Sequence, residues 1–115
     1  MKTILVLDDT AEILELVGGF LERNGFDVIT ANSGYQALKI LKHVKVDAVV
    51  SDFEMPIMDG AAFILKAREE YEKPIIVFTG AVINKVPGAN AVVHKTDHKA
   101  LLTMLRALTE ETEAA

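Results

Sequence analysis

Short hydrophobic runs alternate with longer amphipathic segments along the chain. Five runs rich in β-branched and aliphatic residues are predicted to form strands, at residues 3–7, 27–31, 47–51, 74–78 and 91–93. Three of these runs are almost entirely apolar: ILVL, AVV and IIVF. Runs of this kind are typical of parallel strands that are buried on both faces. The pattern therefore predicts an α/β domain with a five-stranded parallel sheet and helices on both of its faces.

The first two predicted helices have clear boundary signals. Apolar residues recur at helical spacing from Ile13 to Leu21, and Asn24-Gly25 is a usual helix stop because glycine accepts the left-handed conformation. The second helix begins at Ser33-Gly34-Tyr35-Gln36, a capping box in which the serine and glutamine side chains bind the free amides of the first turn. It continues to Leu41.

Two further helices are predicted, at residues 59–71 and 97–108, and Asp97 is expected to cap the second of them. Only twelve residues separate the fourth and fifth strands, so a helix there must be short or absent. We expect the domain to occupy residues 1–111 and to be followed by a frayed tail at 112–115.

Length, charge and composition exclude several classes of function. The 115 residues correspond to one domain, and the absence of cysteine excludes a cysteine nucleophile or a cysteine-ligated zinc site. No run approaches the ~20 apolar residues of a membrane span, so we expect a cytoplasmic protein without membrane contact. The net charge of −5 argues against nucleic-acid binding, which requires a basic surface.

Polar side chains follow four of the five predicted strands. Asp8-Asp9 follows the first strand, Asp52 the third, Thr79-Gly80 the fourth and His94-Lys95 the fifth. In an open parallel sheet, ligands bind beyond the carboxyl ends of the strands. These side chains are therefore predicted to converge at one edge of the sheet.

Three carboxylates at one edge repel one another unless cations neutralise them. A divalent ion with a preference for oxygen ligands, such as Mg²⁺, together with Lys95, would balance the three charges. Asp8 and Asp9 are suited to hold the ion, since Mg²⁺ is typically bound by one or two carboxylates and by water. Asp52 is then free to act as a nucleophile toward a phosphoryl group, whose oxygens would contact Lys95, the Thr79 hydroxyl and the amides of Glu54 and Gly80.

These residues resemble the receiver domain of two-component response regulators. The resemblance is carried by Asp8-Asp9, by the block Asp52-Phe53-Glu54-Met55-Pro56-Ile57-Met58-Asp59-Gly60, by Thr79-Gly80 and by Lys95, and it covers nearly the whole chain in order and spacing. It implies a flavodoxin-like fold with strand order 2-1-3-4-5.

The resemblance also implies a role for each site residue. Asp52 would be the phosphoacceptor and would also contribute an oxygen to the metal site, in which Asp8 and Asp9 are the metal-binding acids and the Glu54 carbonyl is a further ligand to Mg²⁺. Thr79 would be the switch hydroxyl and Lys95 the lysine that contacts phosphate. Such a domain takes phosphate from a histidine kinase or a histidine phosphotransfer protein, catalyses its own phosphorylation and dephosphorylation, and signals to a downstream protein target.

Three features depart from the family pattern. The segment between Thr79 and Lys95 is about six residues shorter than is usual in the family, Val92 stands where the family often has an aromatic residue, and Thr96 stands where it commonly has proline. All three departures affect the surface through which typical receivers report phosphorylation, and not the acids.

Other functions fit the sequence less well. A pseudo-receiver that binds a partner without phosphate is favoured by these departures and opposed by the complete set of acids. An aspartate-nucleophile phosphatase would carry D-x-D after the first strand, where this chain has Asp8-Asp9. A flavin-binding flavodoxin would have a hydroxyl- and glycine-rich phosphate loop at that position.

Overall fold

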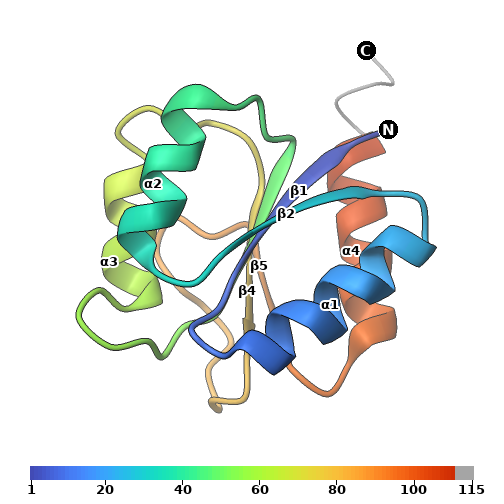
Figure 1. Ribbon diagram of the computed structural model, residues 1–115. Helices are drawn as coiled ribbons and strands as arrows, with labels where there is room; N and C mark the ends of the chain where they lie inside the picture. Colours follow the sequence, from blue (N-terminus) through green and yellow to red (C-terminus); the bar gives the residue numbers. More distant parts are fainter. Residues whose placement is uncertain (111–115) are drawn as a thin grey trace.

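The structure is a computed structural model that describes residues 1–110, with a five-stranded parallel sheet between two layers of helices (Figure 1). The strands lie in the order β2-β1-β3-β4-β5. The elements are β1 (Thr3–Leu7), α1 (Ala11–Arg23), β2 (Asp27–Ala31), α2 (Gly34–His43), β3 (Ala48–Ser51), α3 (Gly60–Ala67), β4 (Ile75–Thr79), β5 (Ala91–His94) and α4 (His98–Glu110). Both the flavodoxin-like fold and its strand order are as predicted.

Each face of the sheet has its own hydrophobic core. Helices α1 and α4 cover one face, and α2 and α3 cover the other (Figure 1). Along β1 the side chains alternate, so that Ile4 and Val6 pack on the side of α1 and α4 and Leu5 and Leu7 pack on the side of α2 and α3. Apolar side chains are needed on both sides of such a strand, which explains its uninterrupted hydrophobic run.

The predicted strands agree with the structure to within one residue at each end, and one predicted helix is too long. Helix α3 ends at Ala67 and not at residue 71. Beyond it the chain tightens into turns, in which the Glu69 and Glu70 amides donate to carbonyls three residues back. The Tyr71 side chain packs against the core, and its hydroxyl donates to the Val46 carbonyl at 3.1 Å. These contacts at the end of α3 replace further helical turns.

The predicted helix boundary signals act locally as expected. The Ser33 hydroxyl accepts from the Gln36 amide at 3.2 Å, and the Gln36 side chain accepts from the Asn32 amide. Gly25 has φ of +93° and follows Asn24, the residue that caps the end of α1. The Asp97 carboxylate accepts from the Ala100 amide in the first turn of α4. The predicted tail at 112–115 lies outside the described residues.

No helix forms between β4 and β5. The connection covers the sheet by burying Val86 and by packing Ile83 and Ala89 partly against the core on the side of α2 and α3. Among the described residues, no helix is both long and apolar enough to cross a membrane.

Arg68 at the end of α3 holds this connection in place. Its guanidinium donates to four oxygens: those of the Gly88, Tyr71 and Lys73 carbonyls and the Asn90 side chain, at 2.7–2.9 Å. The same Asn90 oxygen accepts from the Ile75 amide at the start of β4. One side chain therefore joins α3, β4 and the turn before β5.

Replacement of Arg68 with alanine is expected to lower the free energy of unfolding by about 2 kcal/mol, because several partly buried oxygens lose a charged donor. Urea unfolding of the two proteins measures the difference. Arg106→Ala is the matched control, since Arg106 is exposed and, among residues 1–110, makes one long hydrogen bond of 3.4 Å. Equal losses in the two variants would contradict this role of Arg68.

Candidate functional site

The site lies where β1, β3, β4 and β5 end. Leu7 pairs with Ser51 in the parallel register of β1 and β3, so Asp8 and Asp52 leave the sheet side by side. The Asp8 amide donates to the Ala31 carbonyl and the Asp52 amide to the Leu7 carbonyl. The backbone hydrogen bonds of the sheet thus continue through both acids and fix the positions of their Cα atoms.

Three carboxylates meet at this edge. Oxygen atoms of Asp8, Asp9 and Asp52 lie within 4.8 Å of one another. Asp8 and Asp52 are buried, with 3 % and 6 % of their surface exposed, and Asp9 is exposed. The Lys95 ammonium lies 2.9 Å from Asp8 Oδ2 and 3.2 Å from Asp52 Oδ1 and so reduces the repulsion between the two buried acids.

Backbone amides orient the two buried carboxylates. The Thr10 amide donates to Asp8 Oδ1 at 2.9 Å, and the Phe53 amide donates to Asp52 Oδ1 at 2.8 Å. Within the described part of the chain, Asp52 Oδ2 has no hydrogen-bond or ion-pair partner. Asp52 is therefore held through one oxygen, and its other oxygen is available.

Thr79 and Glu54 lie at the same edge. Thr79 is buried at the end of β4, opposite His94; its hydroxyl accepts from the Ala81 amide at 3.1 Å and its carbonyl accepts from the Lys95 amide. Glu54 is exposed, two residues after Asp52. The structure thus brings all six predicted site residues to the carboxyl ends of the strands.

Burial and neighbouring charges shift the pKa values of Asp52 and Lys95. Burial raises the pKa of Asp52 above its ordinary 3.8, and the Asp8 carboxylate raises it further, while Lys95 opposes both effects. Burial by itself would lower the pKa of Lys95, but its hydrogen bond to Asp8 and the charges of both acids outweigh this effect and raise the pKa. The lysine is therefore charged at neutral pH, and the site without a further cation retains net negative charge.

The donor set fits a hard divalent cation. Carboxylate oxygens are the ligands that Mg²⁺ prefers, and the three acids offer oxygens close enough to share one ion. The exposed Asp9 leaves one side of the cluster open to water. A cation with several water ligands is accommodated better here than one that requires a closed cage.

Comparison with known families agrees with this geometry. The model of the response regulator receiver domain matches residues 4–106, which includes all the site residues. The chain belongs to the response regulator receiver domain family. Its acidic cluster lies within the matched segment.

Curated relatives of this receiver are longer proteins. The response regulator GtcR of Aneurinibacillus migulanus is 40 % identical over 78 residues, which cover 68 % of this chain and 32 % of GtcR. The chain spans about a third of the length of such curated relatives.

Solved structures match almost the whole receiver. The response regulator TrrA of Thermotoga maritima, solved in complex with Mg²⁺-BeF, is 30 % identical with a TM-score of 0.88, over 94 % of this chain and 99 % of TrrA. The chemotaxis response regulator CheY4 of Vibrio cholerae is 28 % identical with a TM-score of 0.85, over 94 % of this chain and 98 % of CheY4.

The residues that depart from the family pattern lie beside the site. Val92 on β5 is half-buried and packs against the core on the side of α2 and α3. Its β-branched side chain has few rotamers, so it cannot change between two side-chain positions as an aromatic ring can. The Thr96 hydroxyl lies 2.8 Å from Nδ1 of the exposed His94.

Gly60 and Ser51 fix the loop that follows β3. The sequence analysis counted Gly60 in the receiver-like block and gave Ser51 no role. A Cβ atom on Gly60 would lie 2.5 Å from the Asp52 carbonyl oxygen, so only glycine permits this close approach, and the Gly60 amide donates to the Phe53 carbonyl at 2.7 Å. The buried Ser51 hydroxyl donates to the Asp52 carbonyl. For Gly60, the signal in the sequence was its place after Asp59 at the start of a predicted helix.

Without a divalent cation, Asp52→Asn is expected to raise the free energy of unfolding at neutral pH. The raised pKa of Asp52 means that ionisation destabilises the folded state. This cost is absent well below pH 3.8, where the acid is protonated in both states, and it grows as the pH rises from the ordinary pKa to the raised pKa of the folded state. The gain from the substitution therefore grows with pH.

Urea unfolding from pH 4 to pH 7 in the presence of a chelator measures this gain. Asp27→Asn is the control, because Asp27 is exposed and distant from the site, on the N-terminal side of β2. A gain that is independent of pH, or equal in both variants, would show that the Asp52 carboxylate is not destabilised by burial and by Asp8.

Proposed function

We propose that this receiver accepts a phosphoryl group on Asp52 and is the phosphorylated component of a two-component pathway. The observation that carries the proposal is that only one of the two Asp52 carboxylate oxygens has hydrogen-bond or ion-pair partners among the described residues. Oδ1 is held by the Phe53 amide and Lys95, and Oδ2 has no partner among the described residues. A carboxylate that is fixed through one oxygen and free at the other is positioned for nucleophilic attack.

The reaction forms one P–O bond and breaks one P–N bond. Asp52 Oδ2 attacks the phosphorus of a phosphohistidine on a histidine kinase or a histidine phosphotransfer protein, and the imidazole leaves and takes up a proton. The product on this chain is an aspartyl phosphate. Phosphoryl transfer requires mainly positioning and the neutralisation of charge on the phosphoryl oxygens.

The chain supplies part of that neutralisation itself. Lys95 already lies between Asp8 and Asp52, and its ammonium would contact a phosphoryl oxygen. The Thr79 hydroxyl, which now accepts from the Ala81 amide, would donate to another. Water later hydrolyses the acyl phosphate and restores Asp52.

Asp8, Asp9, an oxygen of Asp52 and the Glu54 carbonyl would hold Mg²⁺. When bound, Mg²⁺ supplies two positive charges next to the phosphoryl oxygens. The oxygen donor set supports this assignment. The Mg²⁺-BeF complex of the similar TrrA also supports it.

Incubation with Mg²⁺ and acetyl phosphate is expected to add a single mass of about 80 Da to the protein, since one carboxylate accepts the group. Intact-protein mass spectrometry should detect the adduct in Asp59→Asn, which preserves the α3 cap, and not in Asp52→Asn. An adduct that persists in Asp52→Asn would refute the phosphoacceptor assignment. The absence of an adduct from the unsubstituted chain would favour a pseudo-receiver.

Asp9→Ala is expected to weaken Mg²⁺ binding by at least about tenfold, because few protein ligands surround a largely hydrated ion. Asp9 is exposed and accepts no hydrogen bond within residues 1–110, so the fold should be unaffected. Titration with Mg²⁺ or Mn²⁺, followed by calorimetry, measures the affinity, and Asp27→Ala is the control. Unchanged affinity in Asp9→Ala would exclude this residue from the metal site.

A further inference from the structure

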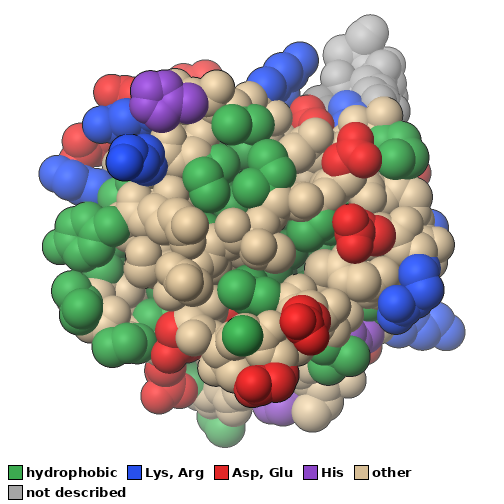
Figure 2. Space-filling model, viewed as in Figure 1, with side chains coloured by type: hydrophobic (Ala, Val, Ile, Leu, Met, Phe, Trp, Pro, Cys, Tyr) green, Lys and Arg blue, Asp and Glu red, His purple; other side chains and the backbone are tan. Residues whose placement is uncertain are grey.

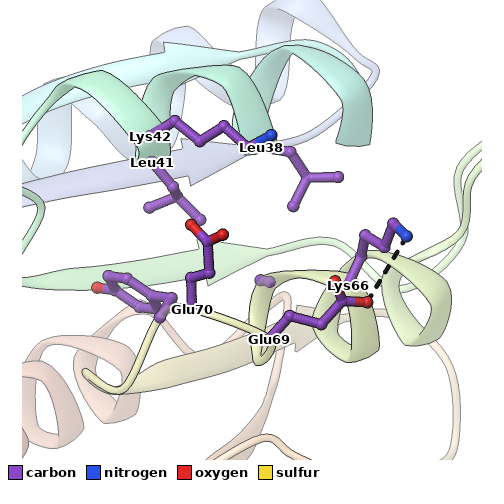
Figure 3. A pocket seen from close by; sticks show the side chains of 8 residues that line it. Leu38, Leu41, Lys42, Lys66, Glu69 and Glu70 are labelled. Atoms are coloured by element: carbon purple, nitrogen blue, oxygen red, sulfur yellow. Dashed lines mark ion pairs between the residues drawn. The ribbon is translucent and has the colours of Figure 1, made fainter.

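An open groove runs between α2 and α3, on the face of the sheet opposite α1 and α4. One part has a volume of about 810 Å³, with an apolar floor formed by Tyr35, Leu38 and Met58 and a rim that carries Lys39, Lys42 and Lys66. The adjoining part, of about 250 Å³, shares Leu38, Lys42 and Lys66 (Figure 3). Glu69 and Glu70 also line this smaller part, so the basic rim belongs to the larger one. In Figure 3, the Leu38 and Leu41 side chains point from α2 toward α3.

The apolar floor is open to solvent. Tyr35 has 62 % of its surface exposed, and its ring makes no contact with another ring in the part of the chain described. Met58 is held against α2 at Gly34, where a Cβ atom would lie 2.6 Å from the Met58 sulfur. An apolar partner that covers this floor would remove exposed apolar surface from water, which favours binding.

The rim carries positive charge on an otherwise acidic protein. Lys39 and Lys42 are exposed and have no ion-pair partner among residues 1–110. The Lys66 ammonium forms an ion pair with Glu69 at 3.6 Å, with both side chains largely in water. Basic side chains and a histidine gather over α2 and α3 with some acidic ones at the edge, whereas acidic side chains spread over β2 and α1 (Figure 2). The chain as a whole has a net charge of −5.

We propose that the α2–α3 groove is a docking site for an amphipathic helix of a protein partner that carries carboxylates beside its apolar stripe. The apolar floor fits leucine-like side chains at spacings of three and four residues. The lysine rim complements acidic residues on either side of that stripe and disfavours a basic helix. Helix α2, with ten residues, is about 15 Å long, so about three turns of the partner can lie along it.

This site is separate from the acidic cluster and does not depend on phosphorylation of Asp52. The proposed docking can therefore be tested on the unphosphorylated full chain, and its failure would leave the phosphoacceptor assignment untouched. Loss of the acetyl phosphate adduct would likewise leave the groove proposal untouched.

The probe is a synthetic amphipathic peptide of about four helical turns, with leucines at helical spacing and glutamates beside them. Titrated into the ¹⁵N-labelled chain, it should shift the amides of residues 35–43 and 58–66 in a saturable manner. The same peptide with lysine in place of every glutamate should bind at least about fivefold more weakly. Equal binding of the two peptides, or saturable shifts centred elsewhere, would overturn the proposal.

Matched variants separate the effect of charge in the groove from the effect of net charge. Lys39→Glu combined with Lys42→Glu should weaken binding of the acidic peptide at least about fivefold, and Tyr35→Ala should also weaken it. Lys85→Glu combined with Lys99→Glu changes the net charge equally at exposed lysines outside the groove and should leave the affinity within about twofold. Equal losses in the two double variants would show that net charge, and not the groove, controls binding.

Two other occupants have distinct signatures. Sedimentation of the chain alone should show a monomer; a dimer that Lys39→Glu dissociates would mean that a second copy occupies the groove and would overturn the proposal. Short single-stranded DNA should leave the amides of residues 35–43 unshifted. Shifts there at lower concentration than with the acidic peptide would assign the groove to nucleic acid instead.

Discussion

The candidate site depends on the register of the parallel sheet. Leu7 lies opposite Ser51, and Thr79 lies opposite His94, so the residues that follow these strands emerge at one edge. Because side chains alternate between faces, a slip of one residue in any pair would move a buried row into the other layer. The two hydrophobic cores prevent that slip. The packing that stabilises the fold therefore also places the charged groups.

Much of this arrangement could be predicted from the sequence. Runs such as ILVL and IIVF have no other stable position than a sheet buried on both sides, so the strands were predicted to within a residue at each end. Their ends then indicated where Asp8, Asp52 and Lys95 would meet. The flavodoxin-like strand order came from the family resemblance, since hydrophobic pattern alone does not choose among parallel arrangements.

The remaining features depend on contacts that are distant in sequence. The periodicity of α3 continues past Ala67, but Arg68 and Tyr71 bind the β4–β5 turn and the Val46 carbonyl, and these partners are invisible in a local pattern. The unequal environment of the two Asp52 oxygens likewise depends on the Phe53 amide and on Lys95, 43 residues away along the chain. Such contacts follow from the assembled fold and not from residue type.

Side-chain hydrogen bonds secure the β4–β5 connection at its two ends, and Val86 anchors its second half in the core. Near β4 the Ala81 amide donates to the Thr79 hydroxyl, and near β5 the Gly88 carbonyl and the Asn90 side chain accept from Arg68. Between these points Val82 is fully exposed. Doubling the length of such a loop costs only about 0.6 kcal/mol in closure entropy. The connection can therefore accept inserted residues after Val82, a reporter peptide or an additional helix among them, while the sheet and the acidic edge keep their geometry.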